Sequence, residues 1–136
     1  MKIRKADIAD YDSLIELWNK CRLGLGTSDT REEIARFMDI NPGTSLVGEI
    51  NGAVAASVLG GFDGRRGLVH HLAVDPQYRK QGYGRAMLQE LETVFREMGV
   101  VKFSFWVKTN NADAISFYKK LGYEVREDII TMSKTL

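Results

Sequence analysis

The sequence predicts an α/β fold in which a mixed central sheet of six or seven strands is flanked by about four helices. Apolar residues switch repeatedly between the three- and four-residue steps of amphipathic helices and short runs typical of strands. In chain order the segments are a strand, two helices, three strands, a helix, a strand, a helix and one or two final strands, which favours helices on both faces of one sheet. Because 136 residues suffice for one core, we expect residues 1–136 to form a single domain.

The first third of the chain combines one strand with two helices. A short strand is expected from Lys2 to Lys5, followed by an amphipathic helix from about Asp7 to Arg22. Glycines in residues 24–27 end this helix, and a second helix is expected roughly from Thr30 to Asp39.

The middle of the chain is β-like. Runs from Ser45 to Ile50 and from Val54 to Phe62 are joined by Asn51-Gly52, a strong hairpin signal. Asp63-Gly64 marks another reversal and leads into a run from Leu68 to Val74. These three runs predict an antiparallel meander.

Helical spacing returns in the last part of the chain. A helix is expected from Gly84 to Met98, then a strand from Val101 to Val107 and a short helix from Ala112 to Leu121. After Gly122-Tyr123, a final pair of strands is expected to run through Ile129-Ile130 to Lys134.

Composition excludes several classes of protein. The formal net charge is +1, so no global field attracts nucleic acid or an anionic membrane, and an anionic ligand must be held by local groups. Cys21 is the only cysteine, which excludes an intrachain disulfide and suggests no metal site; we interpret it as a core residue. Without a signal peptide or a long apolar window, we expect a cytoplasmic protein with no metal, no nucleic acid partner and no membrane association.

The most informative stretch is residues 72–85, Leu-Ala-Val-Asp-Pro-Gln-Tyr-Arg-Lys-Gln-Gly-Tyr-Gly-Arg. A buried strand ends at Pro76 and leads into a loop with Gly82 and Gly84 that opens a long helix. The first turn of a helix exposes unpaired N–H groups and the positive end of the helix dipole. Glycines let a phosphate approach the backbone, so this segment predicts a diphosphate cradle.

Other interpretations of the glycine loop fit less well. A P-loop needs Gly-Lys-Ser/Thr after its spacers, which is absent, and a dinucleotide fingerprint needs glycine or alanine where this chain has Met87. Glycines that serve only a tight turn remain the alternative.

The residues around the loop resemble a known acyl-coenzyme A signature. Arg79-x-x-Gly82-x-Gly84, after Leu72-Ala73-Val74-Asp75-Pro76, is similar to the coenzyme-binding motif of the GNAT superfamily of N-acetyltransferases. Asn111-x-x-Ala114-Ile115-x-x-Tyr118 with Leu121-Gly122-Tyr123 resembles the family's second conserved block, and residues 60–67 resemble a hairpin of small bacterial members. The element order matches over nearly the whole chain.

This resemblance implies an enzyme that binds acetyl-CoA and acetylates a primary amine by direct attack in a ternary complex. In the family, the strand matching 72–74 pairs with the pantetheine arm, the loop matching 79–85 binds the pyrophosphate, and Asn111 holds the coenzyme while capping the next helix. The implied coenzyme-binding residues are Leu72, Ala73, Val74, Arg79, Lys80, Gln81, Gly82, Tyr83, Gly84, Arg85, Asn111 and Tyr118.

The resemblance also implies the catalytic groups. Tyr118 matches the family's usual general acid, because a phenol can protonate the leaving thiolate at neutral pH. Relatives often use a glutamate base on one of two central strands, but here neither strand has a carboxylate. His70 resembles the position of a catalytic histidine in arylalkylamine-type members, and a structural histidine is the alternative. Glu49 or water alone are other candidates for the base.

Strict alternation predicts that His70 and His71 lie on opposite faces of their strand, with His70 on the side of Leu72 and Val74. His71 is then interpreted as structural. A backbone N–H near Val74 is expected to hold the oxyanion.

The acceptor is not identified by the sequence. The resemblance places it between residues 18–29 and 62–67, where aromatic or acidic side chains can contact an amine; each is also consistent with an ordinary core or surface role. These candidates are Trp18, Phe62, Trp106, Asp29, Asp63 and Glu49. A non-catalytic acyl-CoA sensor on the same fold is the alternative function, and a homodimer is a possibility by family analogy.

Overall fold

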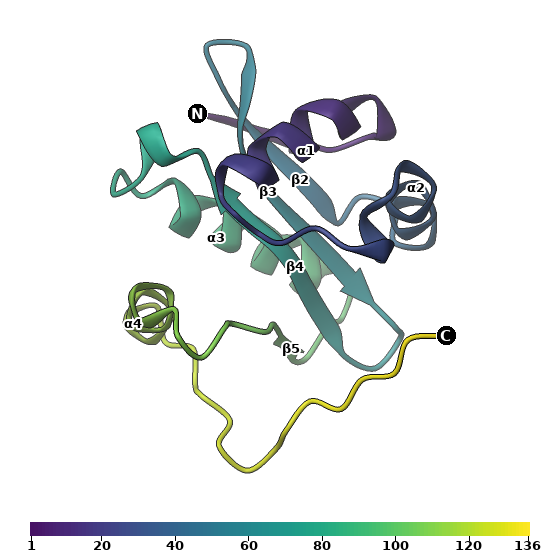
Figure 1. Ribbon diagram of the computed structural model, residues 1–136, viewed down its shortest axis with the longest axis vertical. Helices are drawn as coiled ribbons and strands as arrows, with labels where there is room; N and C mark the ends of the chain where they lie inside the picture. The colour runs from purple at the N-terminus through teal and green to yellow at the C-terminus, as the bar shows by residue number, and fades with distance from the viewer. The chain divides into compact units, whose positions relative to one another are not determined.

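The computed structural model describes residues 1–136 in two units, Met1–Trp106 and Val107–Leu136 (Figure 1). The first unit contains the sheet and three α-helices. The second contains one α-helix and the C-terminal segment.

The sheet of the first unit has five strands in the order β1-β2-β3-β4-β5. They are β1 (Lys2–Lys5), β2 (Ser45–Ile50), β3 (Ala53–Phe62), β4 (Gly67–Val74) and β5 (Phe103–Ser104). The first four strands are antiparallel, whereas β5 pairs with β4 in parallel, so the sheet is mixed. The predicted α/β class and the central meander are therefore confirmed.

The first unit has three α-helices, and a side-chain cap begins the second of them and the short turn before the first. They are α1 (Tyr11–Lys20), α2 (Arg31–Ile40) and α3 (Tyr83–Glu97), each preceded by a short 3₁₀ turn. The Asp7 carboxylate accepts the Ala9 N–H at 2.7 Å, and the Thr30 hydroxyl accepts the Glu33 N–H at 3.2 Å. These caps satisfy donors that a helix start leaves open.

Two hydrophobic clusters cover the two faces of the sheet. On one face, Trp18 of α1 and Ile34 of α2 pack against the sheet with Ala73, and on the other, Met87 and Leu91 of α3 pack against it. Figure 1 shows α1 and α2 on one side of the strands and α3 on the other. The layers match the predicted arrangement.

A glycine in β3 lets α3 approach the sheet. A Cβ at Gly60 would lie 2.7 Å from Leu91 Cδ1 and 2.8 Å from the Thr44 carbonyl oxygen. Glycine is therefore needed at position 60 because a side chain would not fit there, and not because the backbone has a conformation that favours glycine.

The second unit contains α4 (Ala112–Lys120), and residues 121–136 form neither helix nor strand. The predicted sixth and seventh strands are wrong for this structure, and the strand expected from Val101 to Val107 is limited to Phe103–Ser104. Apolar alternation reports strand propensity, but a strand also needs a hydrogen-bonding neighbour that the pattern cannot specify. The four α-helices begin and end close to their predicted limits.

None of these helices has the length and apolar content needed to cross a bilayer.

Replacing Gly60 by alanine should destabilise the fold by about 1–3 kcal/mol, because the new methyl overpacks the contact between β3 and α3. Gly26→Ala is the matched control, since its Cβ would meet no atom within 4 Å. We expect Gly26→Ala to change the free energy of unfolding by less than about 0.5 kcal/mol. Urea denaturation of both variants measures this, and equal effects would contradict the packing argument.

Candidate active site

Strand β4 contains a β-bulge at its centre. Leu59 of β3 pairs with His70, and Ser57 pairs with Ala73, so two residues of β4 lie opposite one residue of β3. His71, one of the two, has a φ of 50°, in the left-handed region. Histidine is among the few non-glycine residues enriched there, and the extra residue bends the strand.

The bulge places both histidines on the same face of the sheet. The His71 ring lies 4.4 Å from the Trp18 ring of α1, and the His70 ring lies 5.7 Å from the Phe37 ring of α2. Leu72 and Val74 instead pack with the α3 cluster. The predicted opposite orientation of the histidines is therefore wrong, because the inserted residue interrupts the alternation on which it rests.

His70 lies among aromatic rings. Besides Phe37, the Trp106 ring is 6.0 Å away and the His71 ring 6.4 Å away. Burial, with a smaller contribution from His71, lowers the pKa of His70, against an opposing effect of Asp29. The imidazole is consequently neutral at pH 7 and has a lone pair that can accept a proton.

An acidic residue from the α1–α2 connection approaches His71. The Asp29 Oδ1 atom lies 2.6 Å from His71 Nε2, and Asp29 Oδ2 accepts the Gly26 N–H at 2.8 Å. From the sequence, Asp29 was a candidate helix cap, a surface charge or an acceptor-binding carboxylate, and its pairing with His71 was not predicted. Because the residues are far apart in the chain, only the tertiary fold brings them together.

The other carboxylates considered from the sequence have structural partners. Glu49 bonds to Arg4, which also holds Asp10 through two hydrogen bonds of 2.8 and 2.9 Å. Asp63 accepts the N–H groups of Arg65 and Arg66, both at 2.7 Å. These contacts anchor β1 and the β3–β4 hairpin.

The candidate aromatic residues also differ in exposure. Trp18 is completely buried and belongs to the core, whereas Trp106 is 66% exposed. Phe62 lies between these extremes. Of the three, Trp106 is the one that contacts the His70 ring and remains open to a ligand.

The loop after β4 is built by local hydrogen bonds. The Asp75 carboxylate accepts the Gln77 N–H at 3.1 Å and the Lys20 ammonium at 3.2 Å. Lys80 and Gly82 then adopt left-handed φ values of 61° and 86°. These reversals lead the chain directly into α3.

The start of α3 carries unsatisfied donors. Gly82 occupies the N-cap position without a side-chain cap, and its carbonyl accepts the Ala86 N–H at 3.0 Å. The N–H groups of Tyr83, Gly84 and Arg85 have no acceptor in the protein. A Cβ at Gly82 would meet nothing within 4 Å, so the approach is open. Donors of this kind, at the positive end of a helix dipole, can bind phosphate oxygens.

An open strand edge leads to this loop. β4 pairs with β5 only at Gly67 and Leu68, so residues 69–74 have no strand neighbour on that side. An extended ligand arm can add there as a strand would. The edge and the glycine loop together fit an elongated ligand that ends in a diphosphate.

The remaining predicted site residues lie in the second unit. The Asn111 side chain caps α4 by accepting the Ala114 N–H at 3.2 Å, which confirms its capping role. Tyr118 packs against the rings of Phe117 and Tyr123, at 5.2 and 6.0 Å. Burial raises the pKa of Tyr118, so its phenol remains protonated at neutral pH.

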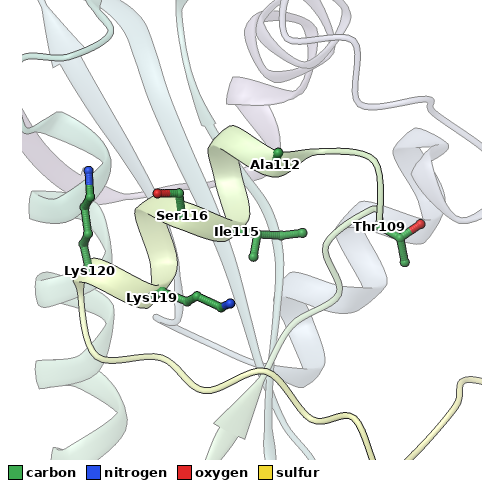
Figure 2. Close-up of a pocket in the computed structure, with 6 residues that line it drawn as sticks. All are labelled: Thr109, Ala112, Ile115, Ser116, Lys119 and Lys120. Carbon is green, nitrogen blue, oxygen red and sulfur yellow. The ribbon is translucent and has the colours of Figure 1, made fainter.

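A cavity of about 540 Å³ lies on α4. Figure 2 shows Ile115 and Lys119 extending to the same side of the helix, toward Thr109, whereas Lys120 points elsewhere. Its lining residues are Thr109, Ala112, Ile115, Ser116, Lys119 and Lys120. None of them is a predicted site residue.

The comparisons with known proteins agree with the fold. A sequence model of the Acetyltransferase (GNAT) family matches residues 11–123, most of the chain. The chain belongs to this family. An acetyltransferase of Sodalis glossinidius (strain morsitans) is 35% identical over 136 residues, covering 100% of this chain and 96% of that protein. An acetyltransferase of Yersinia pseudotuberculosis is 36% identical with the same coverage.

Solved GNAT structures share the architecture. Ard1 from Thermoplasma volcanium has a TM-score of 0.82 and 25% identity, over 92% of this chain and 83% of that one. The PaiA N-acetyltransferase of Thermoplasma acidophilum, solved in complex with coenzyme A, has a TM-score of 0.79 and 18% identity, over 92% of this chain and 90% of that one. The predicted small, bacterial-type GNAT fold is thus confirmed.

The environment of His70 predicts a pH-dependent stability. Burial lowers the pKa of His70 in the folded chain below its ordinary value of 6.5. At a pH between the folded and the unfolded pKa, the unfolded chain therefore binds a proton at this imidazole and the folded chain does not. The contribution of neutral His70 is present above about pH 6.5 and is lost as the pH falls through the folded pKa. We expect His70→Gln to reduce this loss, measured by urea denaturation at about pH 7.5 and pH 5.5. An unchanged pH dependence in the variant would refute the argument.

Proposed function

We propose that this GNAT protein transfers the acetyl group of acetyl-CoA to a primary amine by direct attack in a ternary complex. The observation that carries the proposal is the exposed loop of residues 79–85, whose N–H groups at the start of α3 lack acceptors. Family membership supports an acetyltransferase, and the loop supports a coenzyme with a diphosphate.

The coenzyme is bound mainly by backbone groups in this proposal. The N–H groups of residues 82–85 bind the pyrophosphate, and the open edge of β4 at residues 72–74 pairs with the pantetheine arm. The side chains of Arg79, Lys80, Gln81 and Arg85 surround the phosphates, and Asn111 and Tyr118 complete the family's coenzyme contacts. Local donors are needed because the net charge of the chain is only +1, so no global field attracts an anionic ligand.

His70 is the proposed base. A substrate ammonium with a pKa near about 10 must lose a proton before it can attack, and neutral His70 accepts it directly or through water. The amine nitrogen then bonds to the acetyl carbon, and a backbone N–H of β4 stabilises the developing oxyanion.

Tyr118 is the proposed acid. When the carbon–sulfur bond breaks, the phenol donates its proton to the thiolate of coenzyme A. The second proton of the attacking nitrogen restores the phenol, so one proton remains on His70 to be released to solvent. Burial favours this role because it keeps Tyr118 protonated before the step.

The acceptor is proposed to approach His70 from the face covered by α1 and α2. The exposed Trp106 ring and the Phe37 ring flank this imidazole, and aromatic faces attract an ammonium group. We further propose a single domain, because the family match at 11–123 includes residues of both units. Cytoplasmic location and a homodimer stay predictions.

Acetyl-CoA binding tests the loop. Gly82→Ala should weaken acetyl-CoA binding by about tenfold or more, because alanine disfavours the left-handed φ that presents the donors. Gly64→Ala is the control, since Gly64 has a φ of 94° and equally open space but lies in the β3–β4 hairpin. Both variants should lose about 1–2 kcal/mol of stability. Calorimetric titration measures the affinity for acetyl-CoA. Equal weakening in Gly82→Ala and Gly64→Ala, or no binding by the wild-type protein, would contradict the proposal.

Turnover tests the chemistry. Coenzyme A release is measured with a panel of small amines, amino acids, aminoglycosides and peptides. Tyr118→Phe should lower kcat by about 10²-fold or more while acetyl-CoA affinity changes little. In wild type, the acidic limb of the pH–rate profile should lie below about pH 6.5, and His70→Gln should abolish it. Acetyl-CoA binding without turnover on any amine would instead support the non-catalytic sensor.

A further inference from the structure

We propose that Ser57 and Trp18 are positioning residues that orient the peptide between His71 and Leu72, so that the Leu72 N–H serves as the oxyanion donor. This inference rests on the proposed acetyl transfer. It concerns a buried hydrogen-bond relay from α1 through β3 to the β4 bulge.

The relay consists of two hydrogen bonds. The indole Nε1–H of Trp18 donates to Ser57 Oγ at 2.9 Å, and Ser57 Oγ donates to the His71 carbonyl oxygen at 2.9 Å. Both Trp18 and Ser57 are completely buried. No water competes for these groups, so the bonds are expected to persist.

The direction of the relay follows from its chemistry. An indole N–H can only donate, and a carbonyl oxygen can only accept. Ser57 has a single hydroxyl hydrogen, which must therefore go to the His71 carbonyl. The relay thus has one arrangement and holds this carbonyl toward Ser57.

The same peptide determines where the Leu72 N–H points. In a trans peptide the C=O and N–H groups point in opposite directions, so this N–H faces away from Ser57. The ladder between β4 and β5 ends at Leu68, before this position. Farther along the open segment, the Val74 carbonyl accepts Cys21 Sγ at 3.3 Å and Arg79 Nε at 3.2 Å.

Further contacts hold His71 in its unusual conformation. Its ring lies against Trp18, and its Nε2 atom contacts Asp29. A non-glycine residue at a left-handed φ persists when surrounding contacts determine it. Trp18 therefore contacts both the His71 side chain and, through Ser57, its carbonyl.

Ser57→Ala tests the inference. Loss of the hydroxyl frees the His71 carbonyl and lets the peptide rotate, so kcat should fall by about tenfold or more, while the Kd for acetyl-CoA stays within about twofold. Trp18→Phe, which lacks the indole donor, should lower kcat in the same direction. Ser57→Thr, which restores a hydroxyl, should recover at least part of the kcat lost in Ser57→Ala.

Ser45→Ala is the matched control. Ser45 is a buried serine of the neighbouring strand β2, and its hydroxyl has no hydrogen-bond partner. Its removal should leave both kcat and acetyl-CoA affinity unchanged. A kcat for Ser57→Ala equal to that of Ser45→Ala would overturn the inference.

A spectroscopic measurement separates this inference from the function on which it rests. In the wild-type protein, the Leu72 amide proton should shift more with acetyl-CoA than with coenzyme A, and the difference should vanish in Ser57→Ala. Wild-type binding and turnover without this difference would overturn the relay but not the acetyltransferase. Wild type that binds no acetyl-CoA would overturn both.

Discussion

The arrangement of the site depends on the limited pairing of β4. This strand has neighbours on both edges only at Gly67 and Leu68, and beyond them its β5 side is open. A central strand normally satisfies its backbone groups on both edges, so an open stretch is free to pair with an extended ligand. The glycine loop follows β4 directly in the chain. The open edge of β4 and the N-terminus of α3 are therefore consecutive, and one elongated ligand can contact both.

The bulge adds a second constraint on β4. A left-handed non-glycine residue costs on the order of 1–2 kcal/mol, and here the surrounding core supplies contacts to its ring and to its carbonyl. Because the bulge inserts one residue, it moves His70 to the face of α1 and α2 while Leu72 and Val74 keep packing toward α3. The same local irregularity therefore affects both the proposed base and the proposed oxyanion donor.

Electrostatics in this protein is local. Arg4 joins Asp10 and Glu49 near the first strand, and its hydrogen bonds to Asp10 lower the pKa of that carboxyl. In the proposed machinery, burial acts on two groups in opposite senses, since it lowers the pKa of His70 and raises that of Tyr118. Both side chains are consequently neutral at pH 7, the form in which an imidazole can accept a proton and a phenol can donate one.

The sequence by itself determined the α/β class, the meander, the helices and the glycine loop before α3, because periodicity, turns and caps are local properties of neighbouring residues. It also indicated Asn111 as a cap and the GNAT motifs. Only the tertiary structure decided the face of His70, the Asp29–His71 contact, the partner of Glu49 and the relay through Ser57. Each of these features depends on contacts between residues distant in the chain or on the one residue inserted in β4. The alternation of apolar and polar residues along a strand predicts neither. For the same reason the final strands were overpredicted, since a strand exists only where another strand completes its hydrogen bonds.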